Sequence, residues 1–83
     1  MGYANMLEIS TDLQVNQPTV TMIGNTFVSI ENYLSIITFE SDLIKVKTKL
    51  KSVKISGDGL SLKYITDGEI GIKGTIFTVE YVD

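Results

Sequence analysis

The sequence predicts an all-β domain, built as a small antiparallel sandwich or roll of about seven or eight short strands. From Pro18 onward, apolar and polar residues alternate in short runs, which turn-forming residues interrupt about every 8–10 positions. The chain has 83 residues, which is room for a single domain only. The Asp-Gly turn at residues 58–59 recurs nine positions later, and two such units favour a meander over a short solenoid, which would need three or more repeats.

The chain divides into an N-terminal part, residues 1–17, and a single β domain, residues 18–83. The N-terminal part is expected to be an arm or a short helix. Within it, residues 6–15 fit a short helix, an added strand or a partly ordered arm equally well, since short apolar runs do not discriminate between these structures. The β domain is expected to begin at Pro18, because a missing N–H costs least at the start of a strand.

The first half of the β domain is expected to hold four strands, each ended by turn-forming residues. They are placed at residues 19–23, 26–30, 34–39 and 43–48, with turns at residues 24–25, 31–33 and 40–42. The fourth run alternates cleanly, which directs Ile44 and Val46 inward and Lys45 and Lys47 outward.

The second half is expected to hold shorter runs separated by glycine-rich turns. They are placed at residues 51–56, 60–64 and 69–73, with turns at residues 57–59 and 67–68, and the last run continues to Tyr81. In the last run the inward parity changes after Ile76, because Phe77, Val79 and Tyr81 occupy the opposite face from Ile76. This change predicts a bulge or a sharp bend near Gly74, which would let the chain serve two packed layers.

The inward positions of these runs predict the hydrophobic core. Its expected members are Ile36 or Ile37, Ile44, Val46, Val53, Ile55, Leu60, Leu62, Ile72 and Ile76. The aromatic residues are scattered along the chain, so we expect them to serve mainly in packing rather than as a binding platform.

The composition argues against catalysis and metal binding. The chain contains no Cys, His, Arg or Trp, and all seven basic residues are lysine, so the usual general base, thiol nucleophile and zinc ligands are missing. Asp58, Asp67 and Glu69 lie in glycine-rich loops, but turn geometry explains them better than a calcium site does. We expect no catalytic residue, no metal and no cofactor.

The charges are segregated along the chain. Residues 1–44 carry five acids and no base, residues 45–54 carry five lysines and no acid, and residues 55–83 carry five acids and two lysines. Such blocks favour self-docking or a polar partner over nucleic acid. Lys45, Lys47, Lys49 and Lys51, spaced two apart, form a candidate docking stripe; the competing interpretation is a solvated sheet face that blocks edge aggregation.

The sequence shows no membrane or export signal. No run approaches about 18 consecutive apolar residues, and the first residues lack the basic and apolar regions of a signal peptide. We therefore expect a cytoplasmic protein without direct membrane insertion.

The run from residue 18 to residue 81 resembles the YabP/YqfC family of sporulation proteins from endospore formers. The matching pieces are residues 18–25 (PTVTMIGN), 30–33 (IENY), 44–48 (IKVKT), 53–57 (VKISG), 60–65 (LSLKYI) and 72–76 (IKGTI). The pieces TMIGN and LKYI are closer to the YqfC branch. The sequence departs from the family at residues 49–52 (KLKS), where a glycine is usual after the fourth strand.

The resemblance implies a mother-cell protein of late spore-envelope or coat assembly, either free in the cytoplasm or peripheral at the forespore membrane. It also implies a partner, a sporulation membrane protein encoded nearby, and carries over no catalytic residue. The leading hypothesis is a structural or adaptor protein that acts through protein–protein docking, alone or as a homo-oligomer. The alternative is a small β-domain that binds a glycan or an anionic envelope polymer through the lysine-rich strand face.

Overall fold

The computed structural model describes residues 17–83, and all of the regular structure in this part of the chain is β-strand. Most of the predicted N-terminal arm therefore lies outside the described residues. The strands are β1 (Thr19–Ile23), β2 (Phe27–Glu31), β3 (Tyr33–Phe39), β4 (Leu43–Thr48), β5 (Ser52–Ile65) and β6 (Glu69–Val82). They form one antiparallel sheet in the order β1-β2-β6-β5-β4-β3, which confirms the all-β class.

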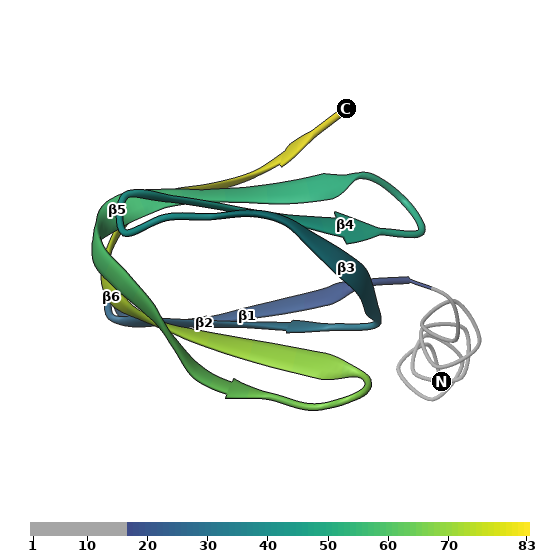
Figure 1. Cartoon of the computed structure of the whole chain (residues 1–83), viewed down its shortest axis with the longest axis horizontal. Helices are drawn as coiled ribbons and strands as arrows, with labels where there is room; N and C mark the ends of the chain where they lie inside the picture. Colours follow the sequence, from purple (N-terminus) through teal and green to yellow (C-terminus); the bar gives the residue numbers. More distant parts are fainter. Residues whose placement is uncertain (1–16) are drawn as a thin grey trace, which may run out of the picture.

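The single sheet folds over on itself because its two longest strands bend. β5 and β6 have 14 residues each, and different neighbours pair with their two halves. β2 pairs with residues 69–73 of β6, whereas β4 pairs with residues 53–56 of β5. The result is two layers (Figure 1): a β2 layer below (β1, β2 and the halves of β5 and β6 next to their connecting turn) and a β4 layer above (β3, β4 and the other halves).

The bend lies near Gly74, as the change of parity predicted. Gly74 has a φ of 142°, and a Cβ there would stand 2.7 Å from the Gly59 carbonyl oxygen, so only glycine fits without strain. The register between β5 and β6 shifts beside Ser56, where Phe77 is skipped, and Phe77 projects outward with 66% of its surface exposed. The bend and the bulge together bring both Ile76 and Val79 onto the core.

The two short hairpins support the bend with their turns. The amides of Gly74 and Ile76 donate to Thr26 and Asn25 in the β1–β2 turn, at 3.2 and 2.7 Å. On the other strand, the amide of Leu60 donates to Ser41 in the β3–β4 turn at 2.8 Å.

The prediction of a turn at residues 57–59 is therefore wrong. The β3–β4 turn supplies hydrogen-bond partners to the strand there, so β5 passes through the bend without ending. Because β5 and β6 each run unbroken through the bend with 14 residues, residues 17–83 hold six strands in place of the seven or eight short ones expected.

The core lies between the layers and consists of aliphatic side chains. Its members are Val28, Ile30, Ile44, Val46, Val53, Ile55, Leu60, Ile70, Ile72 and Ile76. Most expected positions are confirmed, and Ile36 packs against the core while Ile37 is 51% exposed. Leu62 was wrongly placed: it is 38% exposed, because it lies in the half of β5 that has β6 on one side and no strand on the other.

The segment from Ile30 to Tyr33 joins the layers at the end opposite the bend. Asn32 adopts a positive φ of 64°, a conformation that asparagine tolerates better than most residues. Its amide donates to the Gly68 carbonyl at 2.8 Å and its Nδ2 to the Gln17 carbonyl at 2.7 Å. The Tyr33 hydroxyl donates to the Thr66 carbonyl at 2.8 Å. This segment thus ties the start of β1 and the β5–β6 turn together.

Candidate docking face

The lysines of β4 lie on the outer face of the β4 layer. Ile44, Val46 and Thr48 are buried, and because side chains alternate along a strand, Lys45 and Lys47 point away from the core. Lys45 is half-buried and Lys47 is exposed. The first two members of the expected stripe are therefore where the alternation placed them.

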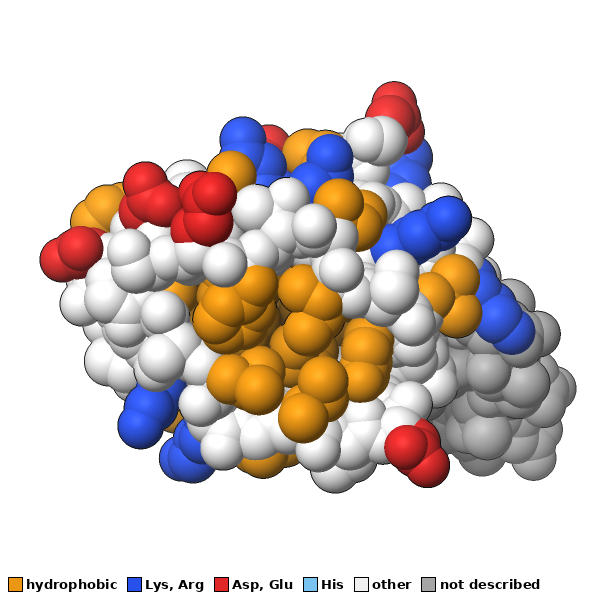
Figure 2. Space-filling view, in the orientation of Figure 1, with side chains coloured by type: hydrophobic (Ala, Val, Ile, Leu, Met, Phe, Trp, Pro, Cys, Tyr) orange, Lys and Arg blue, Asp and Glu red, His pale blue; other side chains and the backbone are white. Residues whose placement is uncertain are grey.

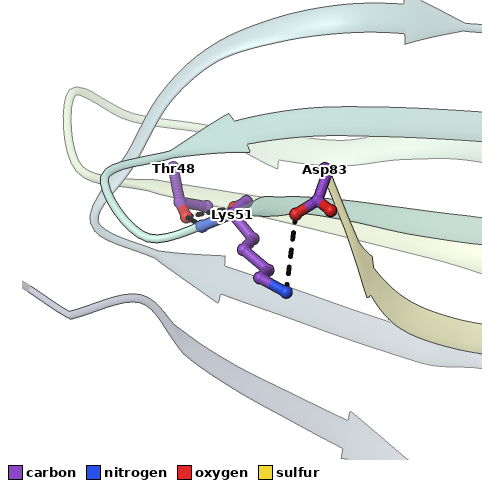
Figure 3. Close-up of polar contacts among 3 residues, drawn as sticks. All are labelled: Thr48, Lys51 and Asp83. Atoms are coloured by element: carbon purple, nitrogen blue, oxygen red, sulfur yellow. Dashed lines mark hydrogen bonds and ion pairs between the residues drawn. The ribbon is translucent and has the colours of Figure 1, made fainter.

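The other two members, Lys49 and Lys51, lie in the β4–β5 turn and not on a strand. Figure 3 shows Lys51 in this turn. Thr48 orders this turn, since its hydroxyl donates to the Lys51 carbonyl and accepts from the amides of Leu50 and Lys51 at 3.1 and 3.2 Å. The threonine hydroxyl thus closes the turn. Lys51 forms an exposed ion pair with Asp83, with Nζ 3.4 Å from the carboxylate.

Another lysine, which the predicted stripe did not include, lies on the same outer face as Lys45 and Lys47. Lys54 of β5 is the direct cross-strand partner of Lys45, and Glu80 of β6 is the next residue in the same row. We call Lys45, Lys47 and Lys54 the lysine face. The signal was present in the sequence, because Val53 and Ile55 point inward and so direct Lys54 outward, but only the pairing of β4 with β5 places it beside Lys45.

An acidic pair occupies the outer face of the other layer. Glu31 of β2 and Glu69 of β6 are direct cross-strand partners, next to the buried pair Ile30 and Ile70. Tyr64 orients one of them, since its hydroxyl donates to Glu69 Oε2 at 2.5 Å. This hydrogen bond, followed by desolvation and the charge of Glu69, raises the pKa of Tyr64 above its ordinary value.

Tyr64 also covers a glycine on this face. A Cβ on Gly71 would stand 2.4 Å from the Tyr64 ring, so the ring fills the space that a side chain would take. Phe27 lies beside it with ring centroids 6.2 Å apart, and Lys63 Nζ stands 5.4 Å from the Phe27 centroid. This cluster is the packed outer surface of the β2 layer.

The described aromatic residues lie mostly outside the buried core, and Phe27, Tyr33 and Tyr64 make packing contacts. Phe39, Phe77 and Tyr81 are 43%, 66% and 48% exposed, and among the aromatics of residues 17–83 it is Tyr33 that packs against the buried cluster. Short β-branched and leucine side chains fill the narrow space between the layers instead. Figure 2 shows hydrophobic side chains at the surface between the layers.

An apolar groove of about 350 Å³ separates β1 from the last part of β6. Its lining residues are Val20, Met22, Val53, Val79, Glu80 and Tyr81. A pocket for an anionic glycan would be expected to carry lysine at its rim, and this lining has none. Within residues 17–83, no group of three or more acidic side chains is arranged to hold a metal ion, and none of this part forms a helix able to cross a bilayer.

The comparisons with known proteins support the family resemblance described in the sequence analysis. The model of the YabP family matches residues 14–83. The Bacillus subtilis (strain 168) protein described as uncharacterized protein YqfC is 34% identical over 77 residues, which cover 93% of this chain and 83% of that protein. No solved structure is significantly similar to the chain. Because the family model covers the whole β domain, this chain belongs to the YabP family.

Proposed function

We propose that this chain is a non-enzymatic adaptor of endospore formation, which docks onto another protein through the lysine face. Membership of the sporulation-associated YabP family indicates a role in sporulation, and this family is not a known enzyme family. The adaptor works in the cytoplasm of the mother cell. Its partner is a sporulation membrane protein encoded nearby, which holds the adaptor at the forespore membrane during envelope or coat assembly.

The observation that carries this proposal is the direct pairing of Lys45 with Lys54. Like charges directly opposite one another in an antiparallel sheet destabilise it, on the order of 0.2–1 kcal/mol. Lys47 adds a third ammonium to the same face, and Glu80 beside Lys54 compensates only part of the charge. An anionic partner surface that binds to this face would relieve the repulsion between the lysines, and this relief would add to the binding free energy.

The shape of the face favours a protein over a small ligand. The lysines stand on the outside of a sheet, and the lysine-free groove lies between β1 and β6. Small-molecule sites are concave, whereas a sheet face matches an extended partner surface. The alternative is that the lysine face binds a free anionic envelope polymer, and the experiment must distinguish this binding from binding of a protein partner.

The test is capture of the partner from detergent-solubilised membranes of sporulating cells by the full chain. The variant Lys45→Gln with Lys54→Gln alters the lysine face, and Lys63→Gln with Lys73→Gln removes the same charge from the opposite layer as a matched control. Two surface ion pairs are worth roughly 0.4–2 kcal/mol, so the first variant should bind about 2- to 30-fold more weakly at low salt. The difference in binding between this variant and the parent should shrink as salt is added.

Equal binding by the two variants at every salt concentration would show that the lysine face takes no part in docking. A soluble polyanion that binds the parent chain while no membrane protein is captured would favour the envelope-polymer alternative. Thermal melting of both variants checks that the fold is unchanged.

A further inference from the structure

We propose that a second copy of this chain also binds the lysine face, stacked so that the outer face of the β4 layer of one copy lies on the outer face of the β2 layer of the next. This inference rests on the proposed function in one respect, since both use the lysine face for docking. It differs in naming the chain itself as an occupant and in requiring the acidic pair on the opposite layer.

The two outer faces carry opposite charges at the end away from the bend. On the β4 layer this end holds Lys47 and the turn with Lys49 and Lys51. On the β2 layer it holds Glu31 and Glu69, which are direct partners. At this end the β4 layer is therefore mainly basic, with Asp83 paired to Lys51, and the β2 layer is acidic. Each face also contains a like-charged cross-strand pair.

The charges are reversed at the bend. The β3–β4 turn lies beside the bend of β5 through its hydrogen bonds to Gly57 and Leu60, so Glu40, Asp42 and Asp58 gather there on the β4 layer. On the β2 layer, Lys73 is the partner of Phe27, and Lys63 lies over the Phe27 ring. In Figure 2 acidic side chains gather at the upper left and one lies at the lower right, whereas lysines lie along the top and upper right, with one acidic group among them, and at the lower left.

This arrangement fixes the orientation of a second copy. A copy displaced perpendicular to the layers, without rotation, brings lysines onto acids at both ends of the face. A copy rotated by half a turn about the stacking direction brings like charges together instead. Electrostatic complementarity of this kind selects one register and suppresses others.

The lysine face and the acidic pair of one copy cannot neutralise each other, because they lie on opposite sides of the molecule. Packed sheets stand about 10 Å apart, and outward side chains extend further on both sides. This separation exceeds the screening length of about 8 Å at physiological salt. Within one copy Lys54 has Glu80 as its cross-strand neighbour, and a second molecule can place further carboxylates next to Lys45 and Lys54. The same contact gives Glu31 and Glu69 counter-ions.

Stacking by displacement joins two different faces, so the contact is heterologous and does not close. Each added copy exposes a new lysine face on one side and a new acidic pair on the other. The assembly is therefore open-ended, and its length rises with protein concentration and falls with salt.

The experiment measures the mass of the full chain by light scattering, at low and high salt, over a range of concentrations. The parent should exceed the 9.2 kDa of one chain at least twofold at low salt and approach it at high salt. The lysine-reversed variant (Lys45→Glu with Lys54→Glu) and the acid-reversed variant (Glu31→Lys with Glu69→Lys) should each remain monomeric alone. Mixed in equal amounts, they should assemble again, because each then offers the faces that the other lacks.

A parent that stays at the mass of one chain under all conditions overturns the inference, and so does a mixture that stays monomeric. Because Glu69 accepts the Tyr64 hydrogen bond, Glu31→Lys alone serves as a second acidic variant if the double variant melts early. Capture of the membrane partner separates the two proposals. Capture by the acid-reversed variant supports the proposed function independently of stacking, whereas stacking without capture supports stacking alone.

Discussion

Adding one methyl group at Gly74 should destabilise the whole domain, because this residue forms the bend that creates the second layer. Its φ of 142° strains any residue with a side chain, at a cost of about 1–3 kcal/mol. The new Cβ would also stand 2.7 Å from the Gly59 carbonyl oxygen and 2.9 Å from the Leu60 Cα, and overpacking of this kind costs about 1–3 kcal/mol. Gly74→Ala should therefore lose roughly 2–6 kcal/mol, out of a total of about 5–15.

The assay is thermal unfolding followed by circular dichroism, with two other glycines as controls. Gly24 has a φ of 53° but open space around it, so Gly24→Ala isolates the strain. Gly68 has open space and no such strain, so Gly68→Ala should unfold close to the parent. For a domain of this size, Gly74→Ala should unfold at least about 8 °C below Gly68→Ala. A difference of about a degree would refute the bend as the origin of the two layers.

Three further predictions concern the core, the β4–β5 turn and the acidic pair. Ile55→Ala should lose about 2–4 kcal/mol in urea unfolding, and a loss below about 1 kcal/mol would contradict its burial. Thr48→Val should lose about 1–3 kcal/mol, whereas Thr48→Ser should not; equal losses would mean that the hydroxyl does not hold the turn. Tyr64→Phe should lower the free energy of unfolding below pH 10.0, where the Tyr64 hydroxyl is protonated and donates to Glu69. This loss should vanish as pH rises through the raised pKa of Tyr64. A loss that does not depend on pH would exclude the hydrogen bond to Glu69 as its cause.

The strands and their inward faces were predictable because alternation is a local property of the chain. Ile44 and Val46 on β4, and Val53 and Ile55 on β5, all point inward as the sequence indicated. The turn before β6 was also correctly placed. The prediction that Leu62 is buried was wrong for a non-local reason. Its exposure depends on the lack of a neighbouring strand on one side of this half of β5.

The family, too, could be recognised from the order of short motifs, and the structure gives some of these motifs a physical role. Asn32 and Tyr33 tie the start of β1 and the β5–β6 turn together, and Gly74 forms the bend. Thr48 supplies the hydrogen bonds that close the turn at residues 49–51.

The amino-acid sequence alone thus determined the all-β class, the outward direction of Lys45 and Lys47, and the shift of parity near Gly74. Only the tertiary structure decided that β5 continues through residues 57–59, because hydrogen bonds from the distant β3–β4 turn replace those of a local turn there. Strand pairing also decided the charged faces. Lys54 meets Lys45, and Glu31 meets Glu69 across 38 positions of sequence, because a cross-strand partner depends on sheet order and register, which the local alternation of side chains does not contain.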